Sequence, residues 1–356
     1  MTRGQPGGLG LRDLNPGYFA VVMATGIVSR AAYLDGATLL AGVLLAVAAA
    51  AYVVLVVAYG WRFARYRQEF LADATDPVTA FAFFTFVAGS NVLGAGLAAD
   101  HFPGITAGLL VIAGLAWLLL GYGIPGALIA RQGPRPALSG ANGTWFLWVV
   151  GTQSVAVSAA ALPPSAALAA LAVACWSVGM VLYLIVATLV LAALLLFGAG
   201  PAEVTPPYWV FMGATAISVL AGAQILRLPA DAFIVAARPV IAGLSVAAWA
   251  FGTWLIPPLI AVGAWRHLIR HVRLRYEPVL WSIVFPVGMY GVASRALGTA
   301  VHVPWLVTLG GDEAWVALAV WVLVFLGMCG SLLAQRLRAP ARGLRRDGQE
   351  GGPLPG

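Results

Sequence analysis

The sequence predicts an all-α membrane protein with ten transmembrane helices. Hydrophobic residues make up 61% of its 356 residues and charged residues only 9%, whereas soluble domains carry about 25% charged residues. The chain also contains ten separate apolar runs, each about 18 residues or longer, which is the length that crosses roughly 30 Å of hydrocarbon as a helix. A soluble core could not bury this many apolar runs, so composition and run length together predict the membrane class.

Charged residues, Pro and Gly delimit the ten spans. In chain order, the predicted spans cover residues 16–34, 38–59, 78–98, 105–130, 144–161, 165–197, 207–227, 232–264, 279–301 and 314–335. The sixth and the eighth run to about 33 residues, so they must tilt, kink or extend beyond the bilayer. Pro257 and Pro258 supply a kink in the eighth span, and a re-entrant break inside either long run is the alternative.

The distribution of arginine predicts the orientation. All 20 basic residues are arginine, and 16 of them lie in the N-terminal segment, in alternate loops or in the tail. The loops on the opposite side carry no arginine and hold Asp35, Asp100, Asp231, Asp312 and Glu313. Because basic loops stay in the cytoplasm, both termini are expected to be cytoplasmic.

The loops on the acidic side are mostly short, so successive spans are expected to pair as five helical hairpins. The predicted transmembrane domain covers residues 16–337, preceded by a cytoplasmic segment (1–15) and followed by a disordered tail (338–356) rich in Arg, Gly and Pro. The exclusive use of arginine is typical of a GC-rich bacterial genome, so the expected location is a bacterial plasma membrane.

Several function classes are excluded by what the chain contains. The net charge of +7 is spread over short loops, so no basic domain is available for nucleic acid. The absence of lysine excludes a Walker A loop and a lysine Schiff base. Cys175 and Cys329 lie in apolar spans, where core packing is favoured over a disulfide. His267 and His271 share a helix face within an arginine run, so no metal site or cofactor is expected.

Acidic residues are equally informative, because all 13 fall in loops, tails or the edges of the predicted spans. The sequence therefore predicts no buried carboxylate to act as a proton relay or cation site. A membrane-embedded enzyme acting on lipid-linked substrates is an alternative function. That alternative would need a cluster of His, Asp, Glu or Cys near an interface, which the sequence does not offer.

Four arginines lie within or at the edges of spans, towards the acidic side: Arg30, Arg227, Arg238 and Arg295. An arginine at membrane depth costs at least roughly a few kcal/mol, so it normally faces protein or a water-filled path. Three of the four, Arg30, Arg227 and Arg295, lie near the outer ends of odd-numbered spans. The alternatives are that they extend to the lipid headgroups, or that Arg227 and Arg238 pair with Asp231.

Helical spacing places further residues on the same faces as these arginines. A conduit lined by the odd-numbered spans would be apolar in its middle and cationic towards the outside, which is typical of anion pathways. We expect Arg30, Arg227 and Arg295 to attract the anion. The predicted lining residues are Phe19, Met23, Gly26, Asn91, Gln153, Gln224, Gly288 and Val292.

Two segments carry a resemblance to a known family. The first is NPGYFAVVMATGIVS at 15–29, and the second is the pair FGTWLIPPLIAVGAWRH at 251–267 and LWSIVFPVGMYGVASRAL at 280–297. Together they resemble the tellurite-resistance/dicarboxylate transporter family, in the superfamily of voltage-dependent anion channels and malic acid transport proteins. This family includes fungal malate permeases and sulfite exporters and the slow anion channels of plant guard cells. The resemblance implies five hairpins around a quasi-fivefold central pore, and homo-oligomers that are often trimers.

The resemblance also implies a gate and a cargo. The family's pore is occluded by a phenylalanine in a W-x-x-x-F context, and Trp281 and Phe285 occupy these positions here, followed by the helix-kinking Pro286. We therefore expect Phe285 to gate the pore, with ordinary helix packing as the alternative. The expected cargo is a C4-dicarboxylate such as malate, or sulfite. A tellurite-resistance protein that acts indirectly is the alternative function. Arg295 departs from the family pattern, so its expected role follows from the position of the arginines and not from the resemblance.

Overall fold

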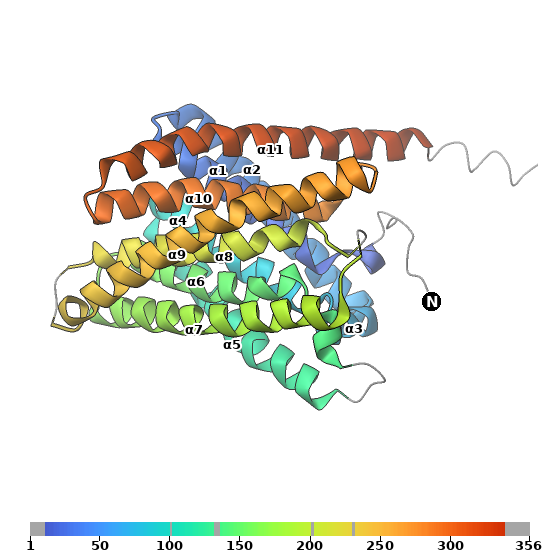
Figure 1. Cartoon of the computed structure of the whole chain (residues 1–356), viewed down its shortest axis with the longest axis horizontal. Helices are drawn as coiled ribbons and strands as arrows, with labels where there is room; N and C mark the ends of the chain where they lie inside the picture. The colour runs from blue at the N-terminus through green and yellow to red at the C-terminus, as the bar shows by residue number, and fades with distance from the viewer. Residues whose placement is uncertain (1–10, 100–101, 132–135, 201–202, 230–231, 339–356) are drawn as a thin grey trace, which may run out of the picture.

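The structure is a computed structural model that describes residues 11–99, 102–131, 136–200, 203–229 and 232–338 (Figure 1). Within these residues the chain forms helices and no strand, and ten helices are long and apolar enough to cross a membrane. This confirms the predicted all-α class and the number of spans. The predicted tail and Asp231 lie outside the described residues.

Five helices form an inner set. They are α1 (Ala20–Leu34), α4 (Phe84–Ala99), α6 (Phe146–Ala161), α8 (Val210–Leu226) and α10 (Trp281–Ala300). Each follows a short 3-10 turn, namely η2 (Pro16–Phe19), η3 (Ala80–Phe83), η5 (Gly143–Trp145), η6 (Pro206–Trp209) and η8 (Pro278–Leu280). The inner helices contact one another in a closed ring in the order α1, α4, α6, α8, α10 and back to α1.

Five outer helices each pack on the inner helix that precedes them in the chain, which gives five hairpins. They are α2 (Thr38–Arg65), α5 (Pro103–Ala130), α7 (Ala166–Phe197), α9 (Ala232–Ala264) with its π-helical extension η7 (Trp265–Ile269), and α11 (Pro304–Arg338). Three short helices complete the described chain: η1 (Leu11–Asp13), α3 (Arg67–Thr75) and η4 (Ala137–Gly140).

Burial separates the two sets of helices. In the most apolar 18 residues of each span, 67–78% are buried in the inner helices, against 11–28% in the outer helices. The outer helices therefore present their apolar side chains to the surroundings, as lipid-facing helices do. The inner helices bury theirs against each other and against the outer helices that pack on them.

Small residues let neighbouring helices approach closely. A Cβ added at Gly213 of α8 would lie 2.8 Å from Cγ of Pro286 in α10, and one added at Gly310 of α11 would lie 2.7 Å from Cβ of Arg295. Since real Cβ atoms do not approach this closely, both crossings require glycine. These contacts fix α10 between α8 and α11.

The last span differs from its prediction, because α11 begins at Pro304, ten residues before the expected start at 314. Proline at the first position of a helix is a known start signal. The early start brings Asp312 and Glu313 into the span, and Glu313 packs half-buried against Gly291 of α10. The prediction that no carboxylate lies within a span was therefore wrong, because two adjacent acidic residues were interpreted as a loop.

Other boundaries agree with the prediction to within a few residues, apart from α2, which continues to Arg65. Both long runs form helices without a re-entrant break: α7 spans 32 residues and α9 spans 33 although it contains Pro239, Pro257 and Pro258. The amphipathic pattern gave no sign of α3, which is polar and short.

Candidate functional site

The inner helices all run in the same direction, so the bundle has two distinct ends (Figure 1). We call the end where they begin the basic end, because Arg62, Arg65, Arg266 and Arg270 lie there. We call the end where they finish the far end. In Figure 1 the basic end is at the right, near α3, and the turn between α10 and α11 marks the far end.

A cavity of about 450 Å³ opens at the far end between the last turns of all five inner helices, and we call it the far cavity. Arg30 of α1, Arg227 at the end of α8 and Arg295 of α10 all line it. Apolar and small residues provide most of the remaining wall. They include Gly26, Ile27, Val92, Gly96, Val157, Ile217, Leu220, Met289, Val292 and Ala296, with Gln224 as an added polar group.

Each cavity arginine is held differently. The guanidinium of Arg30 lies 5.3 Å from the ring centroid of Tyr33. Arg227 is the C-cap residue of α8, and its backbone N–H donates to the backbone carbonyl of Gln224. Arg295 forms an ion pair with Asp35, the residue that follows α1. Cations near the C-terminal ends of helices are also favoured by the helix dipole.

The fourth arginine in a span, Arg238 of α9, is not among the residues that line the far cavity. Its Nη2 donates to the backbone carbonyl of Leu228 at 3.0 Å. This contact ties α9 to the segment that follows α8. The alternative pairing of Arg227 and Arg238 with Asp231 concerns a residue outside the described chain.

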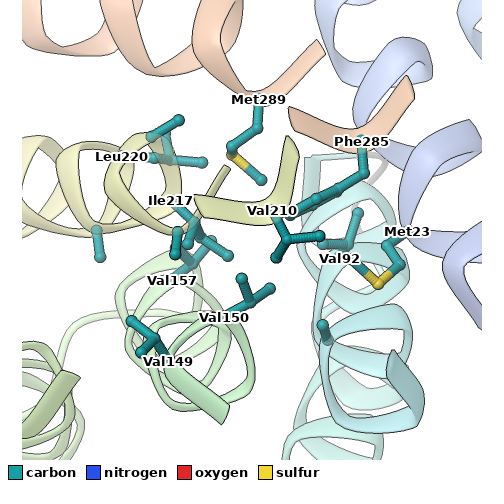
Figure 2. Close-up of a cluster of buried hydrophobic side chains, with 14 of the residues drawn as sticks. Met23, Val92, Val149, Val150, Val157, Val210, Ile217, Leu220, Phe285 and Met289 are labelled. Atoms are coloured by element: carbon teal, nitrogen blue, oxygen red, sulfur yellow. The ribbon is translucent and has the colours of Figure 1, made fainter. Parts of the chain in front are cut away.

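The apolar wall of the far cavity is continuous with a cluster of buried apolar side chains to which every inner helix contributes (Figure 2). We call this cluster the plug. Its labelled members are Met23 of α1, Val92 of α4, Val149, Val150 and Val157 of α6, Val210, Ile217 and Leu220 of α8, and Phe285 and Met289 of α10. Phe285 is fully buried, and its ring points in among the side chains of Val210, Val92 and Met23 (Figure 2).

A second cavity, of about 790 Å³, lies at the basic end, and we call it the basic cavity. It is lined mainly by the 3-10 turns and connecting segments that precede the inner helices, with the first turns of α4, α6 and α10 and the end of α7. On α10, Ser282 lines the basic cavity and Met289 lines the far cavity. Seven helical residues rise about 10 Å. Phe285 therefore lies on the short segment of α10 that separates the two cavities.

The basic cavity is polar at its rim. Asn15 and Asn142 accept hydrogen bonds from the backbone N–H groups of Gly17 and Thr144, so they cap the 3-10 turns η2 and η5 that precede α1 and α6. The positive ends of the helix dipoles point towards this space. Glu203 and Glu277 also line the basic cavity, so its rim combines negatively charged side chains with the positive ends of helices.

Neighbouring residues hold Phe285 in place. Trp281, one turn before it, is fully buried and donates its indole N–H to the hydroxyl of Tyr276 at 3.1 Å. Burial raises the pKa of Tyr276 to about 12, so this hydroxyl stays neutral at physiological pH. Pro286 packs against Gly213 of α8. The backbone that carries Phe285 is thus fixed on both sides.

The structure brings four of the eight predicted lining residues to the far cavity or the plug. Gly26, Gln224 and Val292 line the far cavity, and Met23 belongs to the plug beside Phe285 (Figure 2). The side-chain amide oxygen of Gln224 is buried and has no hydrogen-bond partner among the described residues.

The other four predicted lining residues contact neighbouring helices. Phe19 packs against Tyr52 and Tyr59 of α2, with ring centroids 5.7 and 5.2 Å away. Gln153 donates to the carbonyl of Trp176 in α7 at 3.1 Å.

Asn91 donates to Ser154 of α6 at 3.0 Å, and Gly288 faces Ile27 and Val28 of α1. Helical periodicity groups residues into stripes but does not say whether a stripe faces the axis, a neighbouring helix or an outer helix.

Sequence reasoning missed the role of Asp35, because its partner Arg295 lies 260 residues away and no local pattern links them. It also placed Glu313 in a loop. No group of three or more His, Cys, Asp or Glu that could hold a metal occurs among the described residues. Cys175 is buried, in agreement with the predicted core packing, whereas Cys329 is exposed on α11, so that prediction was wrong for Cys329.

Comparison with known proteins adds the family context. The profile of the voltage-dependent anion channel family matches residues 13–329. An uncharacterized membrane protein of Mycobacterium tuberculosis is 52% identical over 155 residues, which are 44% of this chain and 79% of that protein. An uncharacterized transporter of Methanocaldococcus jannaschii is 21% identical over 328 residues, which are 89% of this chain and 92% of that protein.

Proposed function

This chain belongs to the voltage-dependent anion channel family, and we propose that it moves small anions across a bacterial plasma membrane along the axis of its inner helices. The observation that carries this proposal is the gathering of Arg30, Arg227 and Arg295 in one cavity. These residues come from three separate hairpins, and clusters of arginine or lysine attract anions into pores.

The route runs from the far cavity through the plug to the basic cavity. With the basic end in the cytoplasm, as the arginine distribution indicates, the far cavity faces outwards. Anions collect at the far cavity, where the arginines raise their local concentration. The apolar plug blocks ions and water at rest, because it offers no hydrogen bond to a dehydrated anion.

Phe285 is the gate of this route. It is fully buried between the residues that line the two cavities, so a change of its side-chain rotamer would join them. The continuous ring of inner helices supports the quasi-fivefold pore that the family resemblance implies.

The cargo is a C4-dicarboxylate such as malate, or sulfite. Planar guanidinium groups bind carboxylates and other oxyanions through two parallel hydrogen bonds. Three such groups around a small cavity suit a small dianion of this chemistry, and the described wall residues add few competing polar groups.

Flux measurements on purified protein in liposomes test the proposal. Malate, succinate, sulfite, nitrate and chloride are offered separately, with and without a pH gradient. We expect flux of at least one dianion above that of empty liposomes. Arg227→Gln should lower this flux by at least about threefold, because it removes one attracting charge from the far cavity.

Arg238→Gln is the matched control for Arg227→Gln. It removes the same group from the same end of the bundle, at a position outside the cavity wall. Its flux should stay close to that of the unmodified protein. Equal loss in both variants would show that overall charge, and not the cavity, governs transport, and absence of any anion flux would refute the function itself.

A further inference from the structure

We propose that Asp35 is a built-in competitor for the transported anion: its carboxylate occupies Arg295 at rest, and the anion must displace it to bind. This inference rests on the proposed function and assigns a role to a residue outside the arginine cluster. The observation behind it is the ion pair between Asp35 Oδ1 and Arg295 Nη1.

The pair lies at the wall of the far cavity. Arg295 lines the cavity, and so does Leu34, the residue before Asp35. The side chain of Arg295 is 27% exposed and that of Asp35 is 13% exposed. Arg295 is thus the more exposed member of the pair, and Asp35 is not among the residues that line the cavity. Its Oδ1 lies against Gly311 of α11.

The carboxylate is only half satisfied in this position. Its second oxygen, Oδ2, is buried and finds no hydrogen-bond partner among the described residues. A buried carboxylate oxygen without a partner is unfavourable. Asp35 is thus held by one strong contact, and an incoming anion has to replace only that contact.

The geometry also indicates which anions compete well. A guanidinium presents its N–H donors in a planar fork that matches the two oxygens of a carboxylate. Asp35 uses one Nη1 donor of Arg295, and a ligand that mimics its carboxylate can take the same place. A spherical halide lacks the second oxygen, so displacement favours carboxylates and other oxyanions over chloride.

Competition of this kind would help transport. An anion bound by several guanidinium groups leaves slowly, and conduction needs binding that is weak enough for release. Asp35 supplies a negative charge that can return to Arg295 as the anion departs. It would therefore lower the affinity of the far cavity to a range that allows turnover.

Asp35→Asn tests the inference, because it keeps the shape of the side chain and removes its charge. Initial malate flux into proteoliposomes is measured against malate concentration. We expect the half-saturating concentration to fall by about two- to fivefold, the ratio that corresponds to a partly exposed ion pair. The same measurement with chloride should show a smaller decrease.

Asp312→Asn is the matched control. Asp312 is exposed on α11 and follows Gly311, which lies beside the pair, but Asp312 is not part of the pair. Its variant makes the same change in net charge. Its half-saturating concentration should equal that of the unmodified protein. An equal decrease in both variants would overturn the inference in favour of a general charge effect.

Two other outcomes would also overturn it. A rise in the half-saturating concentration of Asp35→Asn would mean that Asp35 positions Arg295 for the anion, and an unchanged value would mean that the pair is only a structural tether. The proposed function is judged separately: if the unmodified protein carries malate and Arg295→Gln reduces that flux, anion transport stands even where the Asp35 inference fails.

Gly311→Ala provides a second variant should Asp35→Asn fail to fold. Its added Cβ would lie 3.3 Å from Asp35 Oδ1, which is a tight contact, and 3.8 Å from Arg295 Nη1, which is an ordinary one. It therefore presses on the carboxylate while both charges remain. We expect a change in the same direction and of smaller size. An unchanged half-saturating concentration in this variant would contradict the inference.

Discussion

At the scale of single residues, the gate role proposed for Phe285 depends on the position of its side chain. Its ring is as buried as those of Phe84 and Phe146, and its chemistry is the same. What distinguishes it is the short step on α10 between Ser282 and Met289, which line the two cavities. The proposed gate therefore requires that removal of this ring joins the two cavities.

We therefore expect Phe285→Ala to raise anion flux through proteoliposomes several-fold. The truncation also removes buried contacts, with a loss of roughly 3–5 kcal/mol of stability. Thermal unfolding in detergent, followed beside the flux, checks that the variant remains folded. A flux equal to or below that of the unmodified protein would refute the gate.

Phe146→Ala is the control for this prediction. Phe146 is fully buried on α6 but stacks on Phe211 at a centroid distance of 4.4 Å and lies near Tyr183 of α7. It should lose a similar amount of stability without a gain in flux. A comparable gain would show that general loosening of the core, and not the gate, opens the route.

Residue-level prediction of the arginine group rested on depth along the spans alone. Arg30, Arg227 and Arg295 were grouped by their matching depth on alternate spans, and they do line one cavity. Orientation about the helix axis could not be obtained in this way. Phe19 shares a stripe with Arg30, yet it packs against α2, because periodicity does not identify the neighbour that each stripe meets.

At the scale of elements, the crossing of α8 and α10 shows why glycine is needed opposite a proline of a neighbouring helix. Gly213 meets the ring of Pro286, with Cγ, Cβ and Cα all within 3.3 Å of the position of an added Cβ. A proline ring cannot rotate away as a flexible side chain would. Any larger residue at this position must push the two helices apart.

Gly213→Ala should therefore lower the stability by about 1–3 kcal/mol, the usual cost of overpacking. The melting temperature in detergent measures this loss. Gly243→Ala on α9 is the control, because its added Cβ meets nothing within 4 Å. There alanine should leave the melting temperature unchanged or raise it slightly, since alanine favours the helix by about 1 kcal/mol over glycine. Equal melting temperatures of the two variants would contradict the packing argument.

The spans themselves were predictable because hydrocarbon imposes a length and a composition on each helix. Their ends were less so. Helix α2 continues through Arg62 and Arg65, and α11 starts before Asp312 and Glu313. Helical hydrogen bonding does not stop where the apolar run stops, so charged residues within the end turns conceal the true boundary.

At the scale of the whole molecule, the ring depends on contacts that the sequence does not encode locally. The hairpins follow from short loops, but the closure of α1 on α10 joins the first and last inner helices. The ion pair of Asp35 and Arg295 spans 260 residues at that closure. Hydropathy could give the number and order of helices, and only the family resemblance could suggest how they close. The trimer that this resemblance implies stays a prediction.

The separation of charge between the two ends leads to the last prediction, the orientation in the membrane. Sixteen arginines lie in segments assigned to the basic side and none in the opposite loops, so the basic end should be cytoplasmic. In a variant whose two cysteines are replaced by serine, Thr38→Cys at the far end should react with an impermeant thiol reagent in intact cells. Arg270→Cys at the basic end should react only after the membrane is made permeable. Both positions are exposed, so access to the reagent depends on the side and not on burial. The reverse pattern would place Arg30, Arg227 and Arg295 at the cytoplasmic face, and the far cavity would then collect anions from inside the cell.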